Sequence, residues 1–266
     1  MSSLPPVLYH YFSTPLPYAR TLALQEQLHA IQLQHRRSSG THRDILLLLQ
    51  HRPVYTAGRR QVSTSPEVEV EAKRLRGIGA DFVNTLRGGE TTYHGPGQIV
   101  GYPLLDLGRW SPPMGIRSYI CNMQKMLQTH LLEAHGIRYI SSEHTGVFLD
   151  EQTKIASIGV QVRHRFTSHG FSMNITREPL AWFDRVVACG LADVKAGCIA
   201  DAVKKDSSTI TVEGEIEGLV ERFGRVFQRE MIKMDVNLAG IDLMGAIRAV
   251  EEDAEGAGGW LAGPAR

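Results

Sequence analysis

The sequence predicts an α/β protein in which one mixed β-sheet is flanked by helices. Short apolar runs typical of buried strands, such as residues 44–51, occur between segments of helical periodicity, such as residues 18–36. The two kinds of segment interleave without regular strand–helix–strand alternation, which favours a mixed sheet over a doubly wound parallel sheet. The sequence shows no internal repeat and no long linker, so we expect a single domain.

The first half of the chain contains signals for two helices and three strands. Leucine and isoleucine residues spaced by four and three positions predict an amphipathic helix over residues 18–36. The nearly continuous apolar character of residues 44–51 is typical of a strand buried on both faces. A Ser-Pro-Glu start signal and a final glycine predict a helix over residues 65–77. Strands are expected at residues 82–86 and 99–105.

The second half is expected to begin with a long helix that ends at Gly136 and places Cys121, Met123 and Met126 in the core. One face of this helix is predicted to carry Ile116, Ile120, Met123 and Leu127. Residues 145–149 and 154–162 are predicted to form a hairpin, followed by a strand at residues 166–175. Apolar residues at spacings of three and four predict another helix that includes Phe223 and Phe227. From Glu251 onward the chain is rich in glycine, alanine and acidic residues, and we expect a frayed or disordered tail.

Composition narrows the possible functions. A net charge of +1 in 266 residues argues against nucleic acid as a partner, and no apolar run is long enough to span a bilayer. Three cysteines cannot all pair, which suggests a reducing compartment in which a special cysteine is special for its reactivity. The cysteine and histidine spacings do not indicate a zinc site. The absence of acidic residues before Glu26 hints at an organelle address.

One motif carries most of the functional information. Residues 87–98 read Arg-Gly-Gly-Glu-Thr-Thr-Tyr-His-Gly-Pro-Gly-Gln, a stretch unsuited to a helix or an ordinary strand, between two strand-like runs. Glycines leave backbone N–H groups accessible to a ligand, and His94 adds a group that can exchange a proton near neutral pH. The alternative interpretation is a tight glycine-rich turn that only connects two strands.

The same stretch, with Val-Gly-Tyr-Pro-Leu-Leu-Asp after it at residues 100–106, closely resembles the signature of the octanoyltransferases of lipoate synthesis. Residues 145–148, 154–159 and 168–174 resemble further blocks of that family, as does Ala-Cys-Gly at residues 188–190. The resemblance implies the catalytic fold of biotin and lipoate-protein ligases. It also implies a catalytic domain over residues 9–233, with residues 1–8 and 234–266 as flexible or peripheral ends. The expected location is the mitochondrion in a eukaryote and otherwise the cytoplasm.

Cys189 is the best candidate for a nucleophile that accepts and releases an acyl group. An ordinary thiol is only about 3% thiolate at pH 7 and requires a nearby cation for activation. Lys154 lies in a strand of apolar and small residues, where an unpaired charge is costly, although it can also be a strand-end lysine facing water. The resemblance favours the first interpretation, because it implies a catalytic dyad of Cys189 and Lys154. Cys198 is the rival nucleophile, and Ala188 departs from the proline common in relatives, which puts the loop geometry in doubt.

The implied reaction is a two-step transfer without cofactor or metal. Cys189 would take an octanoyl group from octanoyl-acyl carrier protein, and a lysine of a lipoyl domain would then take it from the enzyme. The implied acceptors are the E2 subunits of 2-oxoacid dehydrogenases and the H protein of glycine cleavage. Backbone N–H groups near Gly88 and Gly89 are expected to receive the developing oxyanion.

The resemblance also implies a set of substrate-contacting residues, for which close strand packing is the alternative explanation. They are Arg87, Gly88, Gly89, Glu90, Thr91, Thr92, Tyr93, His94, Ser157, Ile158, Gly159, Gly170, Phe171 and Ser172. A cluster of Arg163, His164, Arg165 and His169 is either a solvated strand face or a landing patch for acidic carrier and lipoyl domains.

Three other functions are compatible with parts of the sequence. An ATP-dependent lipoate-protein ligase would need a lysine-rich nucleotide-binding segment and no cysteine nucleophile. A non-catalytic acyl-binding protein would be expected to have lost the cysteine or the lysine. A cysteine hydrolase would need an orienting pair, for which His94 and His169 are available.

Overall fold

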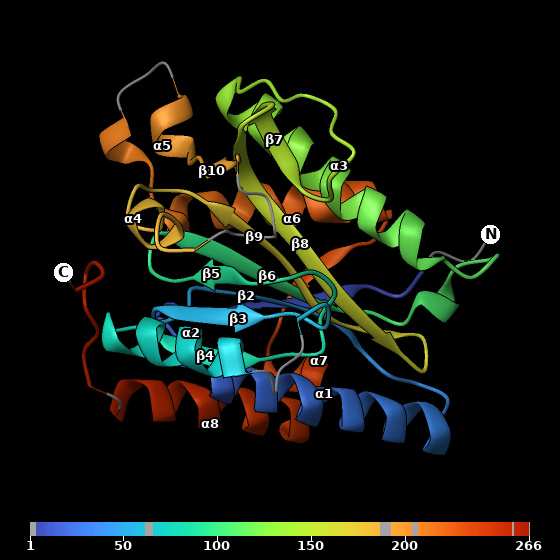
Figure 1. The fold of residues 1–266 in the computed structure, drawn as a ribbon. Helices are drawn as coiled ribbons and strands as arrows, with labels where there is room; N and C mark the ends of the chain where they lie inside the picture. Colours follow the sequence, from blue (N-terminus) through green and yellow to red (C-terminus); the bar gives the residue numbers. More distant parts are fainter. Residues whose placement is uncertain (1–3, 62–65, 187–192, 204–206, 257, 266) are drawn as a thin grey trace.

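The computed structural model describes residues 4–61, 66–186, 193–203, 207–256 and 258–265, which form a mixed sheet covered by helices on both faces (Figure 1). This confirms the predicted fold class. The elements in chain order are β1 Val7–Tyr11, α1 Tyr18–Ser38, β2 Asp44–Leu49, β3 Val54–Ala57, α2 Pro66–Gly77, β4 Asp81–Asn84, β5 Thr92–His94, β6 Gln98–Leu104, a 3₁₀ helix Leu107–Arg109, α3 Ile116–His135, β7 Val147–Asp150, β8 Thr153–Arg163, β9 Phe166–Asn174, α4 Leu180–Phe183, β10 Lys195–Ala196, α5 Ile199–Ala202, a 3₁₀ helix Ser207–Thr209, α6 Val212–Phe227, β11 Met231–Lys233, α7 Val236–Ala239 and α8 Ile241–Gly256.

The large sheet has the strand order β10-β8-β9-β6-β2-β1-β11, with β7 paired to β8 beside this path. Its centre is antiparallel, since β8, β9, β6 and β2 pair in that sense, whereas β1 pairs in parallel with β2 and β11. Such a mixture follows from the irregular order of strands and helices along the chain.

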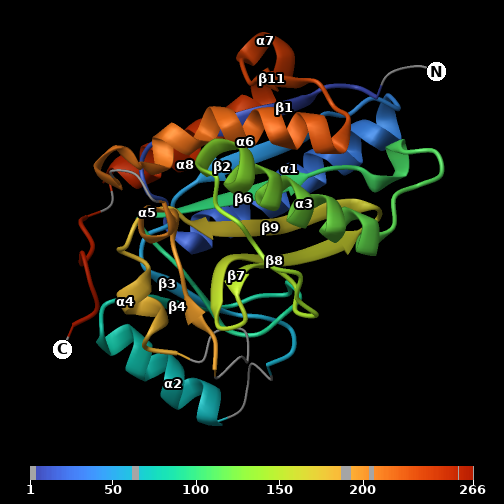
Figure 2. The ribbon, with the colours of Figure 1, turned by 90° about the horizontal axis from the view of Figure 1, so that it is seen from above.

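Both faces of the large sheet are buried against helices. Seen from above, α3 and α6 lie side by side over one face (Figure 2), and α1 and α8 cover the other. Along β2 the side chains alternate between the two cores: Leu46 packs with α3 and α6, and Leu47 packs with α1 and α8. The continuous apolar run that predicted this strand is therefore a consequence of burial on both faces.

A second, three-stranded sheet has the order β4-β3-β5 and packs against α2 and α4. The glycine-rich stretch 87–98 begins after β4, contributes an edge strand to this small sheet and then enters the large sheet at β6. It contains β5, which pairs antiparallel with β3. The expectation that this stretch contains no strand, and lies within one core sheet, is therefore wrong. Three of its residues satisfy their backbone groups by pairing with β3.

Most predicted elements are confirmed, since α1, α2, α3, α6 and the β7–β8 hairpin occupy the expected segments. The buried positions on α3 include Met123 and Met126, as expected. Cys121, expected in the core, is exposed, and Ile116 keeps 50% of its surface accessible in the first turn of the helix. Helical periodicity fixes which residues share a face, but the neighbours that cover each turn come from elsewhere in the chain.

The C-terminal region is more ordered than the sequence suggests. Helix α8 continues to Gly256, so the tail expected from Glu251 onward begins later. Its buried residues include Leu243, Ile247 and Val250, which pack in the same core as Leu24 and Leu28 of α1. Residues 241–256 are therefore part of the core, in contrast to the expected flexible or peripheral end.

We expect Ile247→Ala to lower the free energy of unfolding by about 2–5 kcal/mol, because it leaves a cavity between α8 and the sheet. Ile247 is 0% exposed, whereas Ile241 at the start of the same helix is 84% exposed. Ile241→Ala is the matched control and should change stability by no more than about 0.5 kcal/mol. Urea unfolding of both variants measures the difference, and equal effects would contradict the packing of α8.

Candidate active site

A cavity of about 350 Å³ opens where the signature stretch, the β8–β9 pair and the start of α3 meet. Its volume lies in the range of about 300–1,000 Å³ that is usual for small-molecule sites. The lining includes Lys154 and twelve of the expected substrate-contacting residues: Arg87, Gly88, Gly89, Glu90, Thr92, His94, Ser157, Ile158, Gly159, Gly170, Phe171 and Ser172. Three sequence blocks that lie far apart in the chain thus form one wall.

The floor of the cavity is the β8–β9 ladder. Ser157 lies opposite Ser172, Ile158 opposite Phe171, and Gly159 opposite Gly170. The two expected contact segments are therefore direct cross-strand partners. A side chain at Gly170 would place its Cβ 2.1 Å from the carbonyl oxygen of Gly101 on β6, so close strand packing also operates here. Both interpretations of these small residues are compatible with the structure.

The signature stretch lies directly on this floor. The Gly88 N–H donates to the carbonyl oxygen of Val160 at 3.0 Å. A Cβ at Gly159 would lie 3.0 Å from the carbonyl oxygen of Gly88, so the backbone can come this close because Gly159 has no side chain. The expected oxyanion donors need correction: the Gly88 N–H is already used, whereas the Gly89 N–H makes no hydrogen bond to a described residue. Gly89 has a φ of +95°, which only glycine adopts easily.

The Arg87 side chain holds the signature stretch in place through hydrogen bonds. Its guanidinium donates to the carbonyl oxygens of Thr56 at 2.6 Å and Glu90 at 2.8 Å, and to that of Gly88 at 3.1 Å. Although the side chain borders the cavity, these bonds tie the stretch to β3 of the small sheet. Arg87 is therefore a positioning residue for the wall as well as a lining residue.

Two expected contact residues do not line this cavity. Tyr93 points from β5 into the small core, where its ring stacks on Trp182 at 5.4 Å between centroids. Alternation along β5 sends Thr92 and His94 to the opposite side, which faces the cavity. The Thr91 hydroxyl donates to Gln61 at 2.6 Å.

His94 and His169 on the cavity wall, and His51 next to His94, are buried and neutral. Burial lowers the pKa of His51 and of His169 to about 4, and lowers the pKa of His94 well below its usual value. The expectation that His94 exchanges a proton near neutral pH is therefore wrong. Its Nδ1–H donates to the Gln98 Oε1 at 2.7 Å, which leaves Nε2 as a hydrogen-bond acceptor.

A chain of hydrogen bonds links His94 to the strand of Lys154. Gln98 donates through Nε2 to the Asn174 Oδ1 at 2.8 Å, and Asn174 donates to the carbonyl oxygen of Gly197 at 2.9 Å. The Gly197 N–H in turn donates to the carbonyl oxygen of Lys154 at 2.9 Å. Four blocks of the sequence are thus held in a fixed relation by side-chain amides.

Lys154 is half-buried, and the side chain borders both the large cavity and a small adjoining one of about 20 Å³, enough for about one water. The ammonium nitrogen lies 5.4 Å from the ring centroid of Phe148. It forms no ion pair with any other residue that the structure describes. A cation without a carboxylate partner at a cavity wall is available to stabilise a bound or nearby anion.

The expected nucleophile Cys189, with Ala188 before it, lies outside the described residues. The segments on both sides are described, and Phe183 and Val194 both border the small cavity next to Lys154. β10 carries this flank, pairing Ala196 with Lys154.

Burial argues against the rival nucleophile. The Cys198 side chain is 0% exposed, and desolvation raises the pKa of this thiol to about 11. Such a thiol carries almost no thiolate at neutral pH.

The four residues of the predicted basic cluster, Arg163, His164, Arg165 and His169, do not share one surface in the structure. His164 and Arg165 are exposed in the turn between β8 and β9, and Arg163 pairs with Glu26 at 2.6 Å. His169, in contrast, is 3% exposed and lines the cavity with a φ of 56°, a strained value for a residue with a side chain. It therefore does not belong to a surface patch.

Several lining residues were not among the expected contacts. Tyr18, Tyr102, Ile116 and Ile120 add aromatic and apolar surface, and Arg59 and Arg60 add exposed positive charge. Tyr102 donates its hydroxyl proton to the His51 Nε2 at 2.6 Å, because the other ring nitrogen donates to the Leu16 carbonyl oxygen. Tyr102 lies within the quoted motif, which is the one signal that could have identified it. No helix in the described part of the chain combines the length and the apolar character needed to cross a bilayer.

The neutral histidines predict a loss of stability in mild acid. Unfolded histidines bind protons below a pKa of about 6.5, whereas His51 and His169 stay neutral in the fold down to about pH 4. The contribution of each histidine to the free energy of unfolding is therefore fully present above pH 6.5. Below that pH the free energy of unfolding falls by about 1.4 kcal/mol per pH unit for each histidine, until the pH reaches about 4. Urea unfolding at several pH values should show a shallower slope in His51→Gln. The exposed His144→Gln is the control, and an equal slope in both would contradict the assignment.

The sequence profile described as "Lipoyl protein ligase A/B catalytic domain" matches residues 17–224. A curated relative from Danio rerio, named octanoyl-[acyl-carrier-protein]:protein N-octanoyltransferase, mitochondrial, is 35% identical over 212 residues, which are 80% of this chain and 88% of the relative. The human protein of that name is 34% identical over 227 residues, 83% of this chain and 93% of its own. An octanoyltransferase from Acidobacterium capsulatum is 35% identical over 228 residues, 82% of this chain and 89% of its own.

Solved structures agree on the fold. A putative lipoate protein ligase from T. acidophilum aligns with a TM-score of 0.61 at 15% identity, over 95% of both chains. A lipoate-protein ligase A solved with ATP aligns with a TM-score of 0.61 at 14% identity, over 99% of both chains. The expected lipoate-ligase fold is therefore confirmed. Together with the sequence relatives, this shows that the chain belongs to the octanoyltransferases of the lipoyl protein ligase A/B catalytic domain family.

Proposed function

We propose that this protein transfers an octanoyl group from octanoyl-acyl carrier protein to a lysine of lipoyl domains, through a thioester on Cys189. The relatives' names support the overall activity. The observation that carries the proposal is the position of Lys154, an ammonium without an ion-pair partner among the described residues, on the wall of a cavity built from the motif segments.

In the first step the Cys189 thiolate attacks the carbonyl carbon of the octanoyl thioester. A carbon–sulfur bond forms to Cys189, the bond to the carrier sulfur breaks, and the carrier thiolate takes up a proton. The Lys154 ammonium would stabilise the attacking thiolate and supply that proton. The N–H of Gly89, which makes no hydrogen bond to a described residue, would stabilise the developing oxyanion.

In the second step the ε-amino group of the acceptor lysine attacks the acyl-enzyme. An amide bond forms, the thioester to Cys189 breaks, and the amine loses a proton, for which Lys154 is the proposed acceptor. The apolar residues Ile116, Ile120 and Phe171 supply a surface for the acyl chain. Because a thioester is converted to an amide, the transfer requires neither nucleotide nor metal.

The partner surface is proposed to lie at the cavity mouth. Arg59 and Arg60 are exposed there, and Arg165 is exposed in the nearby β8–β9 turn. Positive charge at the entrance would attract acidic carrier and lipoyl domains, and association should slow as the salt concentration rises. The proposed acceptors are E2 subunits of 2-oxoacid dehydrogenases and the H protein of glycine cleavage. We propose a mitochondrial location if the source is a eukaryote and a cytoplasmic one otherwise.

The acyl-enzyme can be detected directly by intact-protein mass spectrometry after incubation with octanoyl-acyl carrier protein in the absence of ATP. We expect one octanoyl group on the unmodified protein and on Cys198→Ser, which disappears when an acceptor lipoyl domain is added. Cys189→Ala should carry none. Alanine is preferable to serine because a serine hydroxyl can itself accept an acyl group. An adduct that persists on Cys189→Ala, or a transfer that requires ATP, would overturn the proposal.

The role of Lys154 can be measured without a substrate. In a Cys121→Ser background, which removes the exposed thiol, the rate of iodoacetamide alkylation against pH reports the pKa of Cys189. Loss of the ammonium in Lys154→Met should raise that pKa and slow alkylation at pH 6 by about tenfold or more. Lys233→Met, on the far strand β11, is the matched control. If the alkylation rate of Lys154→Met shows the same pH dependence as that of the parent protein, Lys154 does not activate Cys189.

A further inference from the structure

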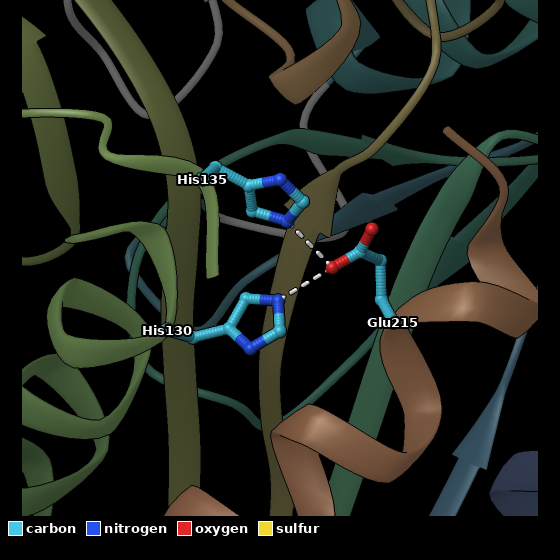
Figure 3. Close-up of side chains that lie close together, drawn as sticks. All are labelled: His130, His135 and Glu215. Carbon is cyan, nitrogen blue, oxygen red and sulfur yellow. Dashed lines mark hydrogen bonds and ion pairs between the residues drawn. The ribbon is translucent and has the colours of Figure 1, made fainter. Parts of the chain in front are cut away.

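Two histidines and a glutamate converge at the opposite end of α3 from the acyl cavity (Figure 3). His130 and His135 belong to the last turns of α3, and Glu215 to the first turn of α6. Both imidazoles point Nε2 at the same carboxylate oxygen, at 2.7 Å for His130 and 2.8 Å for His135. The three donor atoms all lie within 4.8 Å of one another.

The proposed acyl transfer makes no use of this cluster. Ile116 and Ile120 of α3 border the acyl cavity, and His130 follows ten residues later, about 15 Å along the helix axis. The cluster therefore joins the C-terminal end of α3 to the N-terminal end of α6 on the outer layer of the fold. Any role of the cluster must therefore follow from the three side chains themselves.

Its burial is unusual for three polar side chains. The side chains of His130, Glu215 and His135 are 1%, 7% and 10% exposed. The His130 Nδ1 is buried without a hydrogen-bond partner among the described residues. Three buried side chains whose ligand atoms face one another offer a geometry that a metal ion could use.

We propose that His130, His135 and Glu215 form a binding site for one divalent transition-metal ion of the zinc type, which clamps α3 to α6. Two imidazole nitrogens and one carboxylate oxygen are a donor set that Zn²⁺ binds, with water in the fourth position. The partly accessible side of His135 provides the entry path and the place for this water.

The present geometry needs only a small adjustment to hold the ion. With bonds of about 2.0–2.1 Å, tetrahedral ligand atoms lie about 3.3 Å apart. The nitrogen–oxygen distances of 2.7 and 2.8 Å would therefore widen by about half an ångström. His135 is the last residue of α3 and can move by a side-chain rotation. Each histidine must carry its proton on Nδ1 when Nε2 binds the metal, so the two rings change tautomer or lose a proton.

The test uses the full chain without an affinity tag. Co²⁺ serves as the spectroscopic probe and Zn²⁺ as its competitor. We expect one equivalent of Co²⁺ to give the visible absorption of a four-coordinate ion, Zn²⁺ to displace it, and the thermal midpoint to rise by roughly 5 °C at a hundredfold excess over Kd. The metal-free and the metal-loaded protein should transfer the acyl group at the same rate, because the cluster is remote from the cavity.

Three variants make the result specific. His135→Gln and Glu215→Gln should each abolish stoichiometric binding and the thermal shift. His135→Gln is the safer variant for folding, since this ring is the most accessible of the three. The control is His35→Gln, which removes a half-buried histidine 3.0 Å from Asp242 and should leave binding intact. Absence of stoichiometric binding, binding that survives His135→Gln, or a cobalt–thiolate charge-transfer band from a cysteine site would overturn the proposal.

Discussion

The close approach of the signature stretch to β8 is the constraint on which the site depends. The hydrogen bond from the Gly88 N–H to the Val160 carbonyl oxygen, 3.0 Å long, joins two backbones with no side chain between them. Gly159 makes this possible, and Arg87 holds the stretch from the other side through the Thr56 and Glu90 carbonyl oxygens. Small and large sheets are thereby connected, and the space left between them is the cavity.

The electrostatic character of the cavity follows from this packing. Burial lowers the pKa of His51, His94 and His169, so these three histidines are neutral and add no positive charge to the cavity near pH 7. The Arg87 guanidinium donates hydrogen bonds to backbone carbonyl oxygens. The Lys154 ammonium, in contrast, has neither a hydrogen bond nor an ion pair to a described residue, and the Lys154 backbone accepts a hydrogen bond from the Gly197 N–H. An ammonium that is not held by an ion pair, on a strand with a fixed backbone, suits a group proposed to stabilise a thiolate and then move a proton.

The two ends of α3 have separate physical roles. At the first end, Ile116 and Ile120 face a cavity that needs apolar surface and some exposure. At the second end, His130 and His135 meet the negative charge of Glu215 in a nearly closed interface with α6. Between them, Met123 and Leu127 pack on the sheet and keep both ends in a fixed relation. The proposed metal clamp would strengthen the second end without altering the first.

The sequence by itself determined the elements whose signals are local. The periodicity of α1 and α6, the β7–β8 hairpin and the two-sided burial of β2 follow from residue spacing, because each reflects one regular backbone geometry. The motif resemblance also identified most of the cavity wall. Sequence reasoning alone did not find that the signature stretch crosses between sheets, since β5 is stabilised by β3, whose paired residues lie 36 to 40 positions earlier in the chain. Long-range pairing leaves little trace in local composition.

Tertiary structure decided everything that depends on burial by distant segments. Helix α8 is part of the core because its apolar residues pack against α1, which lies more than 200 residues earlier in the chain. Neighbours from other elements cover His169, which is buried, but they leave Cys121 exposed. The neutral state of His94 has the same origin, since desolvation is the work of the whole fold and not of the residue. Residue types thus set which chemistry is available, and packing set which groups are charged, exposed and close enough to use it.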